Sequence, residues 1–170
     1  MLRLADRRFG ASEMVLITPI QNPTPMSYPA PNPFSLAGRV ALVTGSTTGL
    51  GKAMAVALGR AGAKVALNFQ NNTERAEKAF AEFRAAGGEG MLVRGDVSSE
   101  TDVPRIIAEI AKTLGPVDIL VLNATPAQPQ KPIEEYDWAF YQQMLDFFVK
   151  SPYLLSRACL PHMKIGRAHV

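Results

Sequence analysis

The sequence predicts an α/β protein with a parallel, doubly wound sheet that is incomplete, with about four strands in the order 3-2-1-4. Three observations predict this class. Short apolar runs alternate with segments of helical periodicity, a glycine-rich turn joins the first run directly to a helix, and one later helix carries an unbroken apolar stripe. Such alternation gives right-handed βαβ units whose helices cover both faces of a parallel sheet.

The first strand and the first helix surround the glycine-rich turn. Residues 40–43 form an apolar run, residues 44–51 hold three glycines, and a helix-like segment begins at Lys52. Small and apolar residues recur at helical spacing after Lys52, and Gly62 supplies the C-terminal stop. We therefore expect a strand, a tight turn and a helix in immediate succession.

The second and third strands follow in the same order. Residues 64–69 are expected to form a strand, residues 73–86 a helix closed by Gly87 and Gly88, and residues 90–94 a strand that ends before Asp96. This spacing repeats the strand and helix unit of the first segment.

The third helix has the clearest periodicity and leads into a fourth strand. Its apolar stripe comprises Val103, Ile106, Ile107, Ile110, Ala111 and Leu114. Ser99 or Thr101 is its expected N-cap, and Gly115 with Pro116 ends it. Residues 117–122 are expected to form the fourth strand, an exposed apolar edge wherever no further strand pairs with it.

A stiff loop and a long helical segment complete the chain. Residues 126–132 contain three prolines, and residues 134–163 are expected to be helical with an interruption at Pro152. The broad apolar face of this segment comprises Tyr141, Met144, Leu145, Phe148, Val149 and Tyr153. We expect this face to serve the core and an oligomer contact rather than to stack on bases.

The glycine-rich turn points to a ligand that carries phosphate. Its glycines allow the backbone to approach a pyrophosphate, and the N-terminus of the following helix offers N–H groups and a partial positive charge. The glycines fall as Gly45-x-x-x-Gly49-x-Gly51, unlike the common G-x-G-x-x-G fingerprint. A tight turn without a ligand is the alternative.

The form T-G-x-x-x-G-x-G from Thr44 resembles the short-chain dehydrogenase/reductase family, and the resemblance covers residues 34–163. Asp96-Val97 after the third strand and the run 117–124 agree with the family in order and spacing. The resemblance implies a Rossmann-type fold and an NAD(P)-dependent oxidoreductase that transfers hydride between a nicotinamide and a small-molecule alcohol or carbonyl substrate. It also implies a homodimer or homotetramer.

The candidate cofactor-binding residues follow from the turn and from this resemblance. They are Gly45, Ser46, Thr47, Thr48, Gly49, Leu50, Gly51, Asn68, Asp96, Val97, Asn123 and Ala124. In family members the pair at Asp96-Val97 meets the adenine. Asn123-Ala124-Thr125 departs from the usual N-N-A-G, and we expect Asn123 mainly to bond main chain between neighbouring strands.

The charges near the second strand favour NADP, with NAD possible. An NAD site usually carries an acidic residue about 20 positions beyond the glycines. No Asp or Glu occurs between Gly62 and Thr73, so a 2′-phosphate would meet no repulsion there. Thr47 and Thr48 nevertheless stand where many NADP-dependent relatives place a positive residue in the turn.

No catalytic residue is assigned. The family's chemistry needs a Tyr, a Lys four residues later and a Ser, and no Tyr-x-x-x-Lys occurs in this sequence. The pair Tyr153 and Arg157 comes closest to this pattern, and we expect both side chains to serve only the packing of the helix. Phe148 aligns with the family's proton-relay Asn. We therefore expect the chain as written to be inactive, and a non-catalytic nucleotide-binding or redox-sensing protein is the alternative.

Composition limits the other functions. Residues 34–163 hold equal numbers of basic and acidic side chains, so no nucleic-acid partner is expected, and no apolar run is long enough for a membrane helix. His162 has no companion for a metal site. Cys159 is the only cysteine, which fits a cytoplasmic location.

The two ends differ from the rest of the chain. Residues 1–33 hold six of the 13 prolines and are expected to be a disordered leader or the result of a misplaced start codon. Residues 165–170 correspond to the translation of common sequencing-adapter DNA. We therefore expect residues 164–170 to be a non-native tail.

Overall fold

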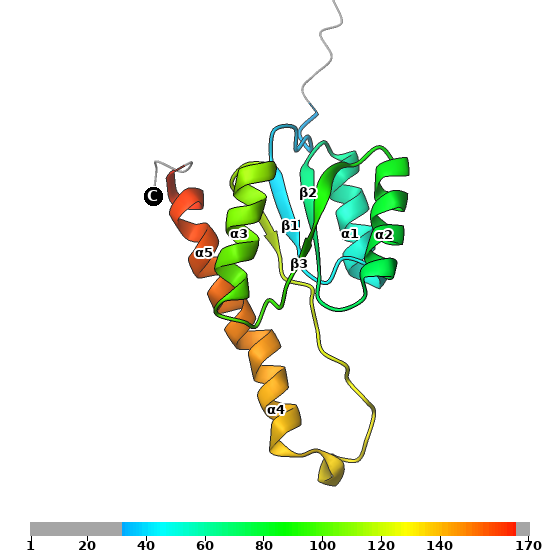
Figure 1. Cartoon of the computed structure of the whole chain (residues 1–170), viewed down its shortest axis with the longest axis vertical. Coiled ribbons are helices and arrows are strands. Elements are labelled where there is room, and N and C mark those ends of the chain that lie inside the picture. The colour runs from blue at the N-terminus through cyan, green and yellow to red at the C-terminus, as the bar shows by residue number, and fades with distance from the viewer. Residues whose placement is uncertain (1–31, 166–170) are drawn as a thin grey trace, which may run out of the picture. The chain divides into compact units, whose positions relative to one another are not determined.

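The computed structural model describes residues 32–165, in which strands and helices alternate (Figure 1). The strands are β1 (Val40–Val43), β2 (Lys64–Phe69), β3 (Glu89–Arg94) and β4 (Ile119–Val121). The helices are α1 (Gly49–Arg60), α2 (Thr73–Ala85), α3 (Asp102–Thr113), α4 (Trp138–Leu145) and α5 (Ser151–Ile165), with a 3-10 turn at Ile133–Glu135 and a π-helical segment at Asp146–Lys150. The predicted leader up to residue 31 and the tail from residue 166 lie outside the described residues.

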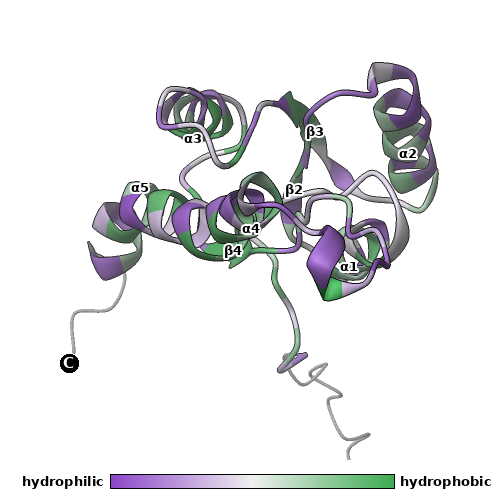
Figure 2. Cartoon of the chain, turned by 90° about the horizontal axis from the view of Figure 1, so that it is seen from below, coloured by the Kyte–Doolittle hydropathy of each residue, from purple (hydrophilic) through white to green (hydrophobic). Residues whose placement is uncertain are grey.

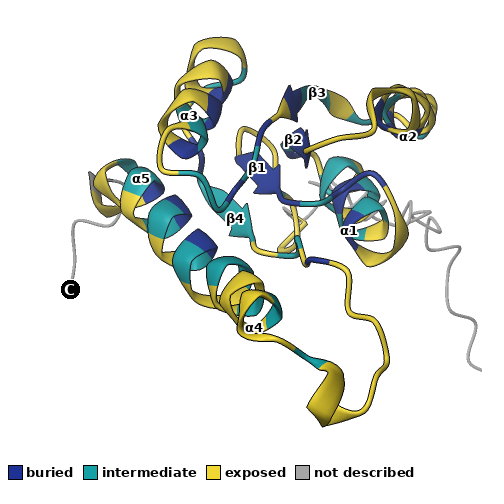
Figure 3. Ribbon diagram, turned by 60° about the horizontal axis from the view of Figure 1, so that its bottom comes forward, coloured by how far each residue is buried: buried dark blue, intermediate teal, exposed yellow. Residues whose placement is uncertain are grey.

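The four strands form one parallel sheet in the order β3-β2-β1-β4, which confirms the predicted fold class and strand order. β1 is central, and its Ala41 pairs with Val65 of β2 on one side and Ile119 of β4 on the other. All four residues of β1 are buried (Figure 3). The apolar run at residues 40–43 is explained by this position, because a central parallel strand has no face in water.

Two apolar cores flank the sheet, and alternate residues of β1 belong to them. Leu42 belongs to the core that includes Ile106 of α3 and Leu155 of α5. Val43 belongs to the core that includes Phe83 of α2. Accordingly, α1 and α2 lie on one side of the sheet, α3 and α5 lie on the other, and hydrophobic strand residues lie between these layers (Figures 1 and 2). Both faces are therefore covered.

Two glycines make room for the fully buried ring of Phe83. A Cβ atom added at Gly59 of α1 would lie 2.7 Å from the Phe83 ring, and one added at Gly88 would lie 2.3 Å from it. Real Cβ atoms essentially never make such contacts, so Gly59 allows α1 to pack against Phe83 of α2, and Gly88 makes room for the same ring in addition to ending α2. The sequence predicted only the stop.

β4 is the edge strand on its side of the sheet, as predicted. It is shorter than expected, and its three residues are only partly buried. Leu122, directly after it, is 45% exposed. The strand pairs with β1 alone among the described residues, so its other edge carries unpaired backbone groups.

The prediction of a helix interrupted at Pro152 is wrong. Pro152 is the second residue of α5, and the preceding Asp146–Lys150 segment is π-helical rather than broken. Because proline has no N–H, it removes one backbone hydrogen bond, and the wider π turn before it lets the helix continue. No helix in residues 32–165 is long and apolar enough to cross a membrane.

Candidate dinucleotide site

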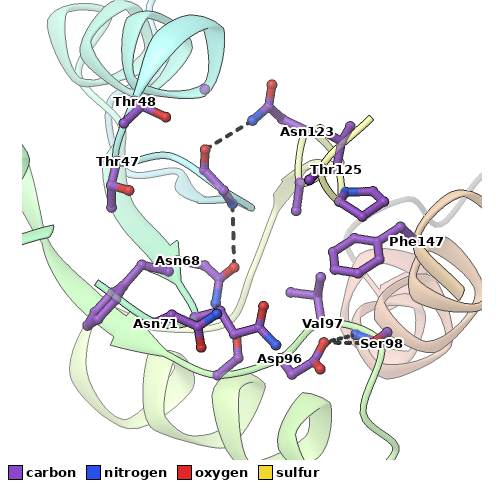
Figure 4. A pocket seen from close by; sticks show the side chains of 18 of the residues that line it. Thr47, Thr48, Asn68, Asn71, Asp96, Val97, Ser98, Asn123, Thr125 and Phe147 are labelled. Atoms are coloured by element: carbon purple, nitrogen blue, oxygen red, sulfur yellow. Dashed lines mark hydrogen bonds between the residues drawn. The ribbon is translucent and has the colours of Figure 1, made fainter. Parts of the chain in front are cut away.

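A pocket of about 760 Å³ lies at the carboxyl ends of the strands (Figure 4). Its wall comes from the turn after β1, the ends of β2 and β3, the segment after β4 and the start of the π-helical segment. β1 pairs with β2 on one side and β4 on the other, so the pocket includes the point where the strand order reverses. Ligands of open α/β sheets bind at this point.

The structure brings together nearly all of the candidate residues. Eleven of the twelve line the pocket: Gly45, Thr47, Thr48, Gly49, Leu50, Gly51, Asn68, Asp96, Val97, Asn123 and Ala124. Ser46 is fully buried, and its hydroxyl donates to the carbonyl oxygen of Asn68 at 3.4 Å. Ser46 therefore lies behind the wall of the pocket.

Each of the three positions in the turn requires glycine for its own physical reason. A Cβ added at Gly45 would lie 2.9 Å from Ala124 Cα, and one added at Gly51 would lie 2.4 Å from Asn123 Nδ2. These two glycines are required by contact with the segment after β4. At Gly49, where φ is +50°, an added Cβ would meet nothing within 4 Å, so this glycine keeps open space beside the pocket.

The N-terminus of α1 opens into the pocket. The helix begins at Gly49, and the side chain of its N-cap residue Thr48 makes no capping hydrogen bond. Gly49, Leu50 and Gly51 all line the pocket. The first N–H groups of a helix lack partners within the helix, and together with the helix dipole they favour an anion.

Asn123 makes the main-chain bonds that the sequence predicted. Its Nδ2 donates to the carbonyl oxygens of Thr44 at 3.0 Å and Gly45 at 3.1 Å. The Thr44 hydroxyl accepts from the N–H groups of Asn123 at 2.9 Å and Ala124 at 3.0 Å and donates to the Val121 carbonyl at 3.3 Å. The glycine turn and the end of β4 are thus fixed to each other.

The loop after β3 is held by its own polar groups. Asp96 Oδ1 accepts from the backbone N–H and the hydroxyl of Ser98, and the Asp96 N–H donates to Asp102 Oδ2 at 2.8 Å. This backbone hydrogen bond, followed by the one from Arg105, lowers the pKa of the Asp102 carboxyl. Val97 is buried beside this turn. The pair Asp96-Val97 therefore has a fixed backbone at the wall of the pocket.

The capping of α3 combines the two predicted alternatives. Thr101 precedes the helix but makes no capping bond, whereas Ser99 Oγ accepts from the Asp102 N–H at 3.2 Å. The hydroxyls of Ser99 and Thr101 lie 3.0 Å apart. Ser99 is therefore the residue that satisfies an N–H of the first turn.

Sequence reasoning missed several residues of the pocket. These are Phe69, Gln70, Asn71, Arg75, Gly95, Ser98, Thr125, Pro126, Ala127, Gln143, Asp146 and Phe147. Arg75, in the first turn of α2, is the only basic residue among the lining residues. Its position soon after the second strand is the signal in the sequence, because residues that contact the ribose of a dinucleotide lie near the end of this strand.

The π-helical segment contributes Phe147 and not Phe148. Phe147 is partly buried and packs against the core that contains Val97, and it lies in the pocket wall (Figure 4). Phe148 is 52% exposed. Lys150 forms an ion pair with Glu100 at 3.2 Å, which joins this segment to the loop before α3.

The tyrosine and arginine that come closest to the family's catalytic pattern lie outside this pocket. Tyr153 is 57% exposed and accepts a hydrogen bond from Arg157 at 3.0 Å, so the pair lies at the surface rather than in a packed core. Neither residue lines the pocket at the strand ends. Within residues 32–165 no group of His, Cys, Asp and Glu could hold a metal ion.

The parallel sheet, its two helical layers and the pocket at the reversal of strand order define a Rossmann-type α/β fold, in which this position is the usual place for a ligand. Residues 39–169 match the family model for short chain dehydrogenase. The chain therefore belongs to the short-chain dehydrogenase/reductase family.

Known relatives agree with this assignment. The chain is 34% identical over 130 residues to 2-dehydro-3-deoxy-D-gluconate 5-dehydrogenase of Formosa agariphila, an alignment that covers 76% of this chain and 49% of the relative. It is 33% identical over 140 residues to tetrahydroxynaphthalene reductase of Pyricularia oryzae, covering 80% of this chain and 48% of the relative.

A solved structure shares the fold. It is a metagenomic short-chain oxidoreductase in complex with NADP, with a TM-score of 0.70 and 33% identity over 77% of this chain and 59% of the other. The chain spans about half the length of the curated relatives it matches.

Proposed function

We propose that this chain is the cofactor-binding part of an NAD(P)-dependent oxidoreductase that acts on a small-molecule alcohol or carbonyl compound. The main support for this function is the pocket at the ends of the strands, which is lined both by the N-terminus of α1 and by the Asp96-Val97 loop. The names of the relatives, a dehydrogenase and a reductase, favour this function over a non-catalytic nucleotide sensor.

The residues of the pocket fit a dinucleotide. The open N-terminus of α1 and the free space at Gly49 would hold the pyrophosphate, because N–H groups and the helix dipole stabilise its charge. Asp96 and Val97 would lie at the adenine, and Ala124 and Thr125 would lie on the nicotinamide side. The bound cofactor would supply or accept the hydride.

The pocket also supports a preference for NADP. Arg75 lines it beside the neutral Gln70 and Asn71, and forms no ion pair with any other residue of the 32–165 range. A guanidinium at this place favours a 2′-phosphate, and residues 70–73, directly after β2, include no carboxylate that would repel one. NAD remains the second cofactor to test.

The sequence of the chain does not supply the proton-transfer residues of the family. The four tyrosines are followed at the fourth position by Asn32, Phe140, Leu145 and Arg157, so none has a lysine there. In the family's chemistry the lysine stabilises the phenolate form of the tyrosine, and no tyrosine of this sequence has a lysine at that spacing. We propose that the 170-residue chain binds the cofactor without catalysing hydride transfer.

The helical segment formed by α4, the π-helical residues 146–150 and α5 supports self-association. Its outward apolar residues include Leu145 (45% exposed), Phe148 (52%), Val149 (60%) and Tyr153 (57%). Figure 3 shows that much of α4 and α5 is exposed. We propose that this surface forms a homodimer or homotetramer contact, and that the protein acts in the cytoplasm, where the single cysteine stays reduced.

The test is a fluorescence titration of the 170-residue chain with NADPH and NADH, followed by an assay of NADPH oxidation with small carbonyl compounds. We expect saturable binding, tighter for NADPH, and no oxidation above the rate without protein. Absence of binding of either nucleotide would overturn the assignment of the pocket, and oxidation would overturn the proposed lack of catalysis.

A further inference from the structure

Asn68 is a buried polar residue at the end of β2, at the centre of the strand ends that form the pocket. The residue is only 2% exposed although it belongs to the pocket wall. Such a group must find hydrogen-bond partners within the protein, because an unsatisfied buried amide is costly.

Every polar atom of this side chain has a backbone partner. The amide Nδ2 donates to the carbonyl oxygens of Val93 at 3.3 Å and Gly95 at 3.1 Å. The amide Oδ1 accepts from the Gly45 N–H at 3.5 Å (Figure 4). Since Nδ2 carries two hydrogens, both are already committed. No donor is left for a ribose hydroxyl.

The backbone of Asn68 adds to the same connection. Its carbonyl oxygen accepts from the Ser46 N–H at 3.1 Å and from the Ser46 hydroxyl at 3.4 Å. One residue therefore fixes the start of the glycine turn on one side and the end of β3 on the other. The loop after β3 carries Asp96 and Val97, which lie across the pocket from Thr47 and Thr48 of the turn in Figure 4.

We propose that Asn68 is a positioning residue, which sets the separation between the glycine turn and the Asp96-Val97 loop and does not contact the ribose. This inference rests on the proposed dinucleotide site. It also explains why an amide stands at the end of β2: only an amide supplies two donors to the β3 side and an acceptor to the turn from one short side chain.

The test compares Asn68→Asp with Asn71→Asp, which places the same charge on an exposed residue of the same pocket. A carboxylate at 68 loses both donors and faces two carbonyl oxygens, so affinity for NADPH and NADH should fall together, by about tenfold or more. At position 71 the charge should weaken NADPH relative to NADH. A switch from NADPH to NADH caused by Asn68→Asp would overturn the proposal, because it would show direct contact with the ribose.

Hydrogen exchange without nucleotide gives the second readout, with Asn68→Ser as a milder variant that introduces no charge. We expect faster exchange at the amides of both Gly45 and Gly95 in this variant, with unchanged protection at Phe83 in the other core. Unchanged exchange at either glycine would overturn the proposal. If the parent chain binds neither nucleotide, the proposed function fails while the exchange experiment still decides the role of Asn68.

Discussion

Thr44 and Asn123 fasten the glycine turn to the end of β4 through reciprocal hydrogen bonds. The Thr44 hydroxyl accepts from the Asn123 N–H at 2.9 Å, and Asn123 Nδ2 donates back to the Thr44 carbonyl at 3.0 Å. The two residues are 79 positions apart in the sequence, and they lie just beyond the ends of the neighbouring strands β1 and β4. The wall of the pocket between β1 and β4 depends on this pair.

Thr44→Val should destabilise the chain by about 2 kcal/mol, because it leaves the partly buried N–H groups of Asn123 and Ala124 without their acceptor. Urea unfolding followed by circular dichroism measures this change. Thr113→Val is the matched control, since its hydroxyl bonds the Glu109 carbonyl on an exposed part of α3. We expect the control to change stability by less than about 0.5 kcal/mol. Equal effects would contradict the role of Thr44.

Arg75→Gln should weaken NADPH binding by about tenfold and leave NADH binding nearly unchanged, because only NADPH carries the 2′-phosphate. Parallel fluorescence titrations with both nucleotides measure the ratio. Arg84→Gln removes the same charge from the last turn of α2, where the guanidinium lies over the Phe80 ring, and should not alter the ratio. A ratio unchanged in Arg75→Gln would remove the main support for NADP.

Gly49→Val should abolish detectable nucleotide binding, because its side chain would occupy the free space next to the N-terminus of α1. Gly38→Val is the control: Gly38 also has a positive φ, and an added Cβ there meets nothing within 4 Å. Both variants should lose about 1 kcal/mol of stability from backbone strain. Equal nucleotide affinity in the two variants would argue against a phosphate at Gly49.

Cys159 should react with a thiol reagent only when the chain unfolds. It is 2% exposed, and burial raises the pKa of its thiol to about 11. As the only cysteine, it reports unfolding without interference in a labelling experiment in increasing urea. Rapid labelling of the folded chain at neutral pH would contradict this expectation.

The raised pKa of the Cys159 thiol also predicts how the stability of the chain changes at high pH. The unfolded thiol releases its proton near pH 8.5, whereas the folded thiol retains it to about pH 11. Because the unfolded chain then binds fewer protons, the contribution of Cys159 to stability falls as pH rises above the unfolded pKa. Cys159→Ala should reduce the loss of stability between these pH values.

Val149→Glu should reduce self-association, since Val149 is 60% exposed on the apolar side of the C-terminal helical segment. Analytical ultracentrifugation over a concentration series compares the variant with the parent chain. Ala81→Glu on the exposed side of α2 controls for an added charge and should leave the distribution unchanged. A monomeric parent chain would contradict the proposed contact.

The elements whose apolar residues follow a clear period could be predicted from the sequence. The second strand was predicted with the observed bounds, Lys64–Phe69, and the stripe of α3 includes its buried residues Val103, Ile106 and Ile110. Local patterns are sufficient there, because each side chain needs only to face a core. The course of the chain through Pro152 could not be predicted, since a π-helical segment has no distinct sequence period.

The sequence by itself determined the fold class and the glycine turn, because hydrophobic periodicity and glycine spacing are local properties. The strand order was predicted from the order common to doubly wound sheets rather than from any local pattern. Only the tertiary structure decided what each residue of the site contacts. Gly51 lies against the side chain of Asn123, and Arg75 of α2 lines the pocket. The side chain of Asn68 forms hydrogen bonds with the backbone of Gly45, Val93 and Gly95. These contacts join residues that are distant in the chain, so they exist only once the strands are paired and their carboxyl ends meet.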